Sequence, residues 1–222
     1  MNSFVLKLIA IITMFIDHIG YVIYDGNISF FNYIGRFAFP IFAFQISQGY
    51  IYTKNLKKYF LRLFLFAIIS QIPFMLFYAI IGSGLYLNTI FTLLLGLSCI
   101  YIYDKHKPIS LFASILIAFI AEITNCDYGF YGVITILIFY VFRKNTINAC
   151  ISFILITLIK HLIYIITFGL YPAYIYLFVF TIIPVIFICL YNGKKGKDTK
   201  YLLYLFYPLH LLLIYGINLI IN

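Results

Sequence analysis

Apolar runs long enough to cross a membrane, separated by short polar or glycine-containing turns, follow one another along the whole chain. A helix needs about 20 mostly apolar residues to cross a bilayer, with a range of about 17–25. By this criterion the pattern predicts nine helices, the fifth of which is short and could be re-entrant. They occupy residues 4–24, 32–52, 59–81, 87–103, 109–123, 128–142, 147–168, 173–191 and 201–220. Asp25-Gly26-Asn27 and Gly82-Ser83-Gly84 end the first and third.

The composition explains why these helices need lipid rather than water. Of the 222 residues, 65% are hydrophobic and only 9% are charged, whereas a water-soluble domain carries about 25% charged residues. We therefore expect an all-α, polytopic transmembrane bundle that forms a single domain over residues 1–222. Asp17 and His18 interrupt the first apolar run, so we expect this segment to be a mature helix rather than a signal peptide.

The distribution of basic residues predicts the orientation. Cytoplasmic loops are enriched in Lys and Arg. With the N-terminus cytoplasmic, thirteen of the fifteen bases fall at the inner ends of the helices or in the inner connections, and the outer connections hold none. The thirteen are Lys7, Lys54, Lys57, Lys58, Arg62, Lys105, Lys107, Arg143, Lys144, Lys194, Lys195, Lys197 and Lys200. A net charge of +9 could indicate nucleic acid in a soluble protein; here it indicates membrane anchoring, and we expect no nucleic-acid partner.

The spacing of the cysteines indicates neither a metal site nor a disulfide framework. The four cysteines are scattered without CxxC spacing, at positions 99, 126, 150 and 189. Structural zinc sites and disulfide frameworks have recognisable cysteine spacings. We therefore expect the cysteines to fill apolar positions, and we expect no metal.

Ionisable residues nevertheless occur inside the predicted helices, where each costs at least ~2.5 kcal/mol to insert. Most of these residues fall in the outer half of the bundle or near the midplane, and together they predict a polar pocket. Three of them are histidines, which are not needed to neutralise a charge. The alternative is a set of separate structural ion pairs, such as Asp17 with Arg36. The residues concerned are Asp17, His18, Arg36, Lys160, His161 and His210, with Glu122 and Asp127 at an outer loop.

Helix 4–24 places a cytoplasmic cation and a histidine on one face. Lys7 and His18 are eleven residues apart, which returns to within ~20° of the same direction and spans about 16 Å. Ile11 and Met14 lie between them on that face. From geometry alone, this pair is more often an accident than a functional stripe.

Several segments resemble the TraX family, the conjugative pilin acetylases. The most specific are LKLIA at 6–10 with MFIDHIG at 14–20, and IGRFAFPIFAF at 34–44. The likeness covers nearly the whole chain. Supporting matches are QGY at 48–50, TKN at 53–55, YFLRL at 59–63, SQIPF at 70–74, NTIFTL at 88–93, CDYG at 126–129, YGV at 131–133 and FYPLHL at 206–211.

This resemblance implies an acetyltransferase of the bacterial cytoplasmic membrane, with cytoplasmic acetyl-CoA as co-substrate. The acceptor would lie at the outer face: the N-terminus of a pilin-like or secreted peptide, or an envelope glycan. Lys7 and His18, which have ten residues between them, also resemble the basic-x10-His pattern of the wider membrane acyltransferases. The departure is Lys in place of the more usual Arg. In those families the histidine is thought to be essential.

Acyl transfer requires a base or nucleophile and a stabiliser of the developing oxyanion. We expect His18 to be the general base or a transient acetyl carrier. Asp17 is about 100° away on the helix, so we expect it to pair with Arg36, which could bind a phosphate, a carboxylate or the oxyanion. His210 and, less directly, His161 would complete the site. Gly35 would allow close helix approach, and Pro40 would bend its helix.

The remaining site residues are expected around this centre. Inner bases, chiefly Lys7, Lys58 and Arg62, would hold the nucleotide of acetyl-CoA, and Asn88, Asp127 and His161 would line the substrate pocket. A small transporter or flippase is the main alternative, because charged residues also line translocation paths. No inverted repeat supports it. A non-catalytic factor for the assembly of a surface structure is a third possibility.

Overall fold

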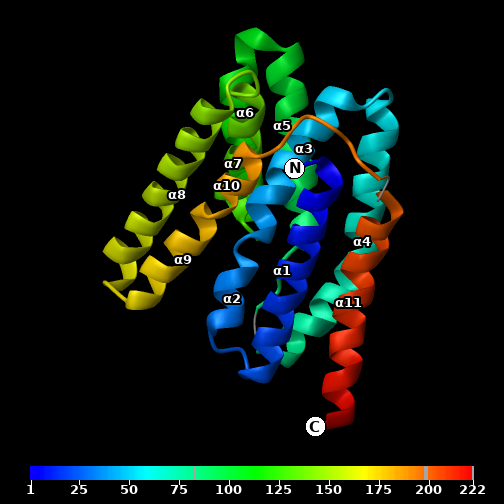
Figure 1. Cartoon of the computed structure of the whole chain (residues 1–222), viewed down its shortest axis with the longest axis vertical. Coiled ribbons are helices and arrows are strands. Elements are labelled where there is room, and N and C mark those ends of the chain that lie inside the picture. The colour runs from blue at the N-terminus through cyan, green and yellow to red at the C-terminus, as the bar shows by residue number, and fades with distance from the viewer. Residues whose placement is uncertain (83, 198–199, 222) are drawn as a thin grey trace. The chain divides into compact units, whose positions relative to one another are not determined.

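A computed structural model describes residues 1–82, 84–197 and 200–221. The described chain is all-α (Figure 1). Ser83 and residues 198–199, which belong to two of the predicted connections, lie outside the described residues. The helices are α1 Ser3–Ile23, α2 Phe30–Gly35, α3 Ala38–Tyr52, α4 Leu56–Ile80, α5 Thr89–Lys105, η1 Lys107–Ile109, α6 Ser110–Ile123, α7 Gly129–Val141, α8 Thr146–Phe168, α9 Pro172–Ile182, α10 Pro184–Cys189 and α11 Lys200–Ile221.

Each of the nine predicted segments coincides with helix in the structure, which confirms the predicted helical pattern. Two segments are divided, contrary to prediction. The segment 32–52 becomes α2 and α3, with a break at Arg36 and Phe37. Pro40 has no N–H to donate to the carbonyl of Arg36, and Gly35 is a weak helix former. The bend predicted from Pro40 is therefore a full break, placed three residues before the proline.

The predicted segment 173–191 is divided for a similar reason. α9 ends at Ile182 and α10 begins at Pro184. A proline inside a helix removes one hydrogen bond and clashes with the preceding turn. At the first position of a helix, a proline is tolerated, because a backbone N–H there would have no partner within the helix.

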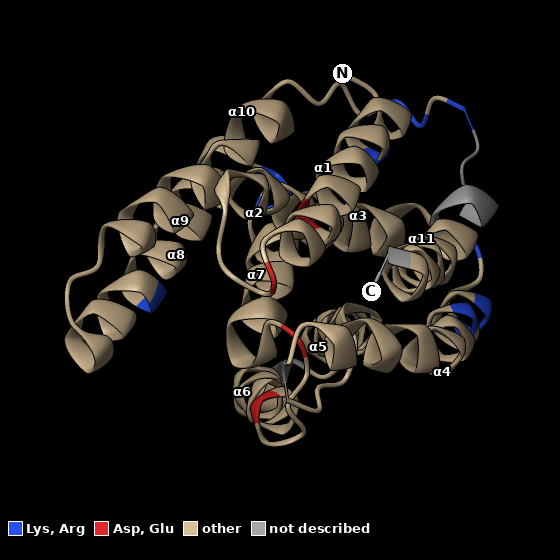
Figure 2. Cartoon of the chain, turned by 90° about the horizontal axis from the view of Figure 1, so that it is seen from below, with Lys and Arg blue, Asp and Glu red and all other residues tan. Residues whose placement is uncertain are grey.

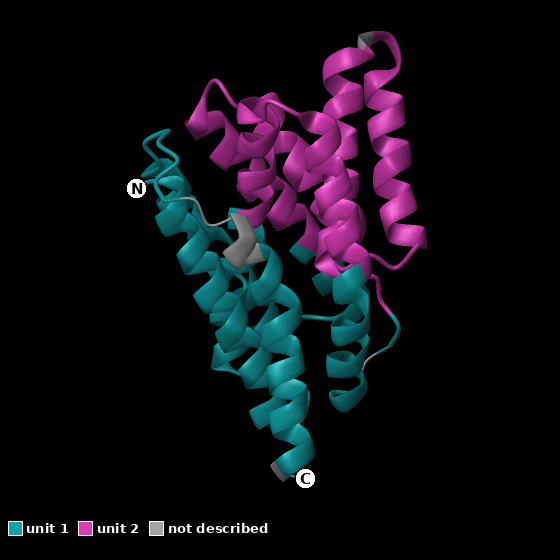
Figure 3. Cartoon of the chain, turned by 90° about the vertical axis from the view of Figure 1, so that its right-hand side faces the viewer, with its two compact units in different colours: residues 1–41, 69–85, 161–222 teal, residues 42–68, 86–160 magenta. Residues whose placement is uncertain are grey.

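The chain forms two compact units, each made of segments distant in sequence (Figure 3). Unit 1 contains residues 1–41, 69–85 and 161–222, and unit 2 contains residues 42–68 and 86–160. The helices α3, α4 and α8 each supply residues to both units.

Large apolar side chains cover the surface of several helices. In α6, Leu111, Phe112 and Ile123 are 67, 74 and 79% exposed. Figure 2 shows charged residues as a few short stretches of an otherwise uncharged ribbon. α1, α4, α8 and the α9–α10 segment are long and apolar enough to cross a bilayer. So much apolar surface suits lipid rather than water. The number of crossings and the cytoplasmic N-terminus stay predictions.

In unit 1, α1 packs along α2 and α11. The start of α1 is held by the connection between α10 and α11: Ser3 N donates to Lys194 O at 2.9 Å, and Asn192 N donates to Met1 O at 2.8 Å. At the other end of α1, Gly26 takes a positive φ of 78° and donates its N–H to Tyr21 O at 2.7 Å. These bonds fix the ends of the helix that carries Asp17 and His18.

In unit 2, α5, α6 and α7 pack against one another. Small side chains allow the close approach: Ala118 and Ala121 of α6 are fully buried beside Cys99 of α5. A Cβ at Gly96 of α5 would lie 2.3 Å from the Ile136 side chain of α7. Small residues at such contacts let helix backbones meet where apolar packing in lipid gives little other driving force.

One carboxylate joins three helices of unit 2. Asp104, near the end of α5, accepts hydrogen bonds from Tyr140 of α7 at 2.6 Å and Tyr50 of α3 at 2.9 Å. Lys105 Nζ lies 3.4 Å from the same carboxylate. Asp104 follows the predicted span 87–103, and the hydrogen bond from Tyr140, with those from Tyr50 and Lys105, holds the pKa of its carboxyl below the usual range.

We therefore expect Asp104→Asn to destabilise unit 2 by about 1–2 kcal/mol near neutral pH. Tyr140 and Tyr50 donate to different oxygens of the carboxylate, and asparagine replaces one of these oxygens with an NH2 group that cannot accept. A carboxyl with a lowered folded-state pKa contributes stability above its unfolded pKa, and this is lost as the pH falls through the folded value. The difference between wild type and Asp104→Asn should shrink below about pH 4. Thermal unfolding in detergent at pH 7 and pH 3.5 measures both effects. An equal difference at both pH values would contradict the role of the carboxylate.

Candidate functional site

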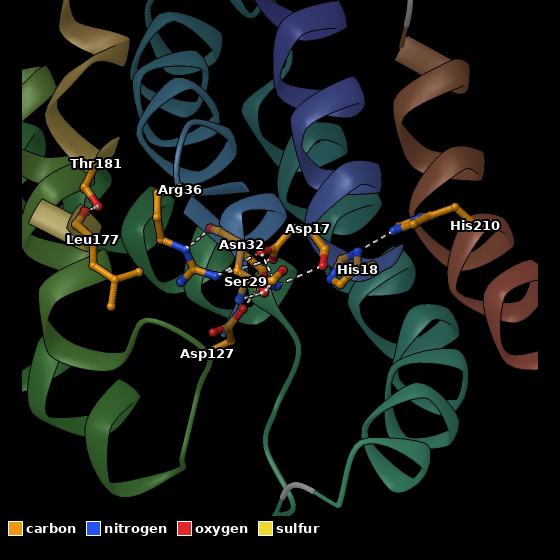
Figure 4. Close-up of polar contacts among 10 residues, drawn as sticks. Asp17, His18, Ser29, Asn32, Arg36, Asp127, Leu177, Thr181 and His210 are labelled. Atoms are coloured by element: carbon orange, nitrogen blue, oxygen red, sulfur yellow. Dashed lines mark hydrogen bonds and ion pairs between the residues drawn. The ribbon is translucent and has the colours of Figure 1, made fainter. Parts of the chain in front are cut away.

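The centre of the candidate site is an ion pair between α1 and the break that follows α2 (Figure 4). Arg36 Nη2 lies 3.2 Å from Oδ1 of Asp17 and 3.4 Å from Oδ2. The two side chains are 23 and 14% exposed. The predicted pairing of these residues is thus present. It lowers the cost of keeping both charges among apolar helices, because each charge compensates the other.

The break between α2 and α3 positions the guanidinium. Arg36 ends α2, and its Nε donates to the carbonyl of Asn32, one turn earlier, at 3.1 Å. This bond uses a carbonyl that the end of the short helix leaves without a helical donor. Arg36 is therefore held by α2 on one side and by Asp17 of α1 on the other.

Asn32 is a site residue that sequence reasoning missed. It is fully buried, and its Nδ2 donates to the Asp17 carbonyl at 3.0 Å and to Asp17 Oδ1 at 3.2 Å. Its Oδ1 accepts from the backbone N–H of Ser29 at 2.7 Å and from the Ser29 hydroxyl at 2.8 Å. A Ser three residues before an amide side chain at a helix start is a capping pattern. That pattern was a signal available in the sequence.

Gly35 is needed for the contact between α1 and α2. A Cβ at this position would lie 2.3 Å from Cβ, Cγ and Oδ1 of Asp17. The predicted close approach at Gly35 is therefore a contact with the ionised residue itself. Any larger side chain must displace Asp17 or move the helix.

On another face of α1, His18 joins a second histidine. Its Nδ1 lies 2.8 Å from Nε2 of His210 on α11 (Figure 4). Nδ1 of His210 lies 2.7 Å from the carbonyl oxygen of Phe206. His18 and His210 are 9 and 3% exposed. The rings of Phe77 and Phe206 pack on His18 and His210, at 4.9 and 4.6 Å between centroids. The structure thus brings Asp17, His18, Arg36 and His210 into unit 1.

Two further predicted residues lie in unit 1. His161 of α8 is buried, with its ring edge against Phe178 at 5.6 Å between centroids. Lys7 lies on α1, which is continuous from Ser3 to Ile23. The helical geometry that places Lys7 and His18 on one face therefore holds. The roles expected for Lys7 and His161 stay predictions.

The other predicted residues lie in unit 2. Asn88 is fully buried and caps α5: its Oδ1 accepts from Ile90 N at 3.0 Å and its Nδ2 donates to Ala67 O at 2.7 Å. Asp127 accepts a hydrogen bond from the Thr89 hydroxyl. These contacts show structural roles at the start of α5. Their expected place in a substrate pocket stays a prediction.

Two of the bases predicted to hold the nucleotide, Lys58 and Arg62, lie on α4 in unit 2. Lys58 is exposed in the first turn of the helix, and the guanidinium of Arg62 lies over the Tyr59 ring at 5.8 Å from its centroid. Their expected contact with the nucleotide of acetyl-CoA stays a prediction. Among the described residues, no group of three His, Cys, Asp or Glu side chains is arranged to hold a metal ion.

The arrangement in unit 1 combines a buried imidazole pair with an ion pair on the neighbouring residue. A neutral imidazole can accept a proton and return it, and a guanidinium can stabilise a developing negative charge. These features define an apolar, membrane-type helical protein with a polar centre built around its first helix.

The comparisons with known proteins agree with this class. The profile of the family described as "TraX protein" matches residues 3–218. The chain belongs to the TraX family. It is 31% identical over 236 aligned residues to the "Probable fimbrial assembly protein FimC, serogroup H1" of Dichelobacter nodosus, covering 96% of this chain and 94% of that protein. No solved structure matches.

The contact at Gly35 leads to a prediction. Gly35→Ala should destabilise unit 1 by about 1–3 kcal/mol, because the added methyl group overlaps the Asp17 side chain. Gly216→Ala on α11 is the matched control, since a Cβ there meets nothing within 4 Å and alanine should stabilise the helix by about 0.5–1 kcal/mol. Thermal unfolding in detergent compares the two. Equal stability changes for both variants would contradict the proposed contact.

A double-mutant cycle tests the ion pair. Asp17→Asn or Arg36→Gln alone should cost about 3–5 kcal/mol, because each leaves one charge buried without its counter-ion. The double variant should be more stable than the sum of the two losses implies, with a coupling energy of about 1 kcal/mol or more. Denaturant unfolding in detergent provides the four free energies. Strict additivity would show that the two side chains act independently.

Proposed function

We propose that this chain is a membrane-embedded acetyltransferase that moves an acetyl group from cytoplasmic acetyl-CoA to an acceptor at the outer face. The observation that supports it best is the buried His18–His210 pair, next in sequence to the Asp17–Arg36 ion pair, in a chain of the TraX family. The pair provides a base where water is scarce, and the guanidinium provides a fixed positive charge.

The acceptor we propose is the N-terminal amine of a pilin-like or secreted peptide, with an envelope glycan hydroxyl as the other chemistry of the same reaction. The relative from Dichelobacter nodosus is named as a fimbrial assembly protein. Fimbriae are built of secreted protein subunits, which favours a peptide over a glycan.

His18 has the central role in the proposed reaction. As general base, it takes a proton from the attacking amine while the amine nitrogen bonds to the thioester carbonyl carbon. The carbon–sulfur bond then breaks, and His18 returns the proton to the departing thiolate. The products are an acetylated amine and free thiol. As a transient carrier, His18 would instead hold the acetyl group between two such transfers.

Arg36 and Lys7 have supporting roles. The guanidinium, which remains charged in apolar surroundings, is proposed to stabilise the oxyanion of the tetrahedral intermediate. Lys7, about three turns from His18 on the same face of α1, is proposed to bind a phosphate of the coenzyme. The Asp17 carboxylate and the Asn32 backbone carbonyl hold the guanidinium in place.

The test is acetyl transfer by the protein reconstituted in lipid vesicles. Acetyl-CoA labelled in the acetyl group is supplied on the side that carries Lys7. The acceptors are a peptide with a free N-terminus, the same peptide with a blocked N-terminus, and an oligosaccharide. We expect label on the free-amine peptide, and at least a ~100-fold loss in His18→Ala, because general base catalysis contributes about that much or more.

His106→Ala is the matched control, since this histidine caps the end of α5 in unit 2. It should transfer label at the wild-type rate. Label on the oligosaccharide alone would change the acceptor to a hydroxyl, and label on the blocked peptide would change it to a peptide side chain. Full transfer by His18→Ala would remove His18 from the reaction. Absence of transfer by the wild type to all three acceptors would contradict the acetyltransferase.

A further inference from the structure

The hydrogen bond between the two histidines and the bond from His210 to the Phe206 carbonyl together determine where their protons lie. His210 Nδ1 is 2.7 Å from the carbonyl oxygen of Phe206. A carbonyl oxygen only accepts hydrogen bonds, so His210 must carry a proton on Nδ1. A neutral imidazole has one N–H and one nitrogen with a lone pair. Nε2 of neutral His210 is therefore an acceptor.

The same argument shows which nitrogen of His18 carries its proton. Its Nδ1 lies 2.8 Å from Nε2 of His210, and a hydrogen bond requires one donor. If His210 Nε2 accepts, His18 Nδ1 must carry the proton. Neutral His18 then has its lone pair on Nε2. The carbonyl of Phe206 thus selects, through His210, which nitrogen of His18 is basic.

The opposite arrangement requires a charged ring. For His210 Nε2 to donate, both of its nitrogens must be protonated. His210 is 3% exposed, and the rings of Phe15, Phe206 and Tyr207 surround it. Removing an imidazolium from water in this way is costly, so the neutral pair is favoured in the resting protein.

Ring packing keeps His210 in the orientation that this arrangement needs. The Phe206 ring stacks on it at 4.6 Å between centroids with an angle of 8°. Phe206 therefore contacts His210 through both its backbone oxygen and its side chain. The imidazole is held on two sides, which fixes the direction of Nε2 toward His18.

We propose that His210 is a positioning residue that holds His18 as its Nδ1–H tautomer, so that Nε2 of His18 is the atom that takes the acceptor's proton. This inference rests on the proposed acetyl transfer. When Nε2 of His18 is protonated, the bond from its Nδ1–H to His210 becomes charge-assisted and stronger. His210 thus also stabilises the imidazolium that forms and then loses its proton to the thiolate.

The tautomer is measured directly by nitrogen NMR of the full chain in lipid with ¹⁵N-labelled histidine. The protein has only four histidines, so single substitutions assign each signal. We expect His18 and His210 to carry their protons on Nδ1, with Nε2 of His18 unprotonated. A wild-type His18 protonated on Nε2 would overturn the proposal.

Two variants separate positioning from packing. His210→Phe keeps an aromatic ring against Phe206 but offers no acceptor, so His18 should lose its tautomer preference and kcat should fall about 100-fold with little change in KM. His210→Gln offers an amide oxygen to His18 Nδ1–H, so the tautomer should remain and kcat should fall less than about 10-fold. An unchanged tautomer in His210→Phe, or equal losses in both variants, would contradict the role of His210.

The outcomes distinguish this inference from the proposed function. If the wild type transfers acetyl groups and His18 is protonated on Nε2, the acetyltransferase stands and the role of His210 is wrong. If the expected tautomer is found but no acetyl group is transferred, the proposed function is wrong and His210 cannot position a base for it. If His210→Phe does not fold, the wild-type spectrum and the glutamine variant still decide.

Discussion

An ionised carboxylate and a guanidinium remain charged among apolar helices only when each compensates the other and their remaining polar atoms are also bonded. The pair of Asp17 with Arg36 meets this condition through its surroundings. Asn32 bonds to Asp17, and its carbonyl accepts from Arg36. Gly35 leaves room for the Asp17 side chain. The break between α2 and α3 places Arg36 at the end of a short helix, where it reaches both partners.

The ion pair has a direct consequence for the neighbouring histidine. Because Asp17 is engaged by Arg36, it does not orient the imidazole of His18, although the two residues are adjacent in the sequence. In serine hydrolases a carboxylate fixes the tautomer of the basic histidine. In this protein, the contacts assign that task to a second imidazole and a backbone carbonyl. A neutral orienting group places no additional charge in an apolar region.

Polar side chains also satisfy backbone groups at the helix ends. Asn2 accepts from Val5 N, Asn88 from Ile90 N, and Glu122 from Phe130 N. Backbone groups in apolar surroundings must find partners within the protein. Several polar side chains therefore serve as helix caps or as links between helices. Asp104, which joins α3, α5 and α7, is the clearest link in unit 2.

The sequence by itself determined the helical segments, their apolar character and most residues of the polar centre, but not Asn32. Runs of apolar residues and their turn signals are local, so nine segments could be located to within a few residues. The pairing of Asp17 with Arg36 was predicted because Asp17 points about 100° away from His18 on the helix.

The tertiary structure alone decided the contacts between residues far apart in the chain. The bond from His18 to His210 spans 192 positions, and no local pattern encodes it. The role of Asn32 and the fit of Gly35 against Asp17 depended on how α1 and α2 pack, because a capping pattern specifies a helix start but not its neighbour.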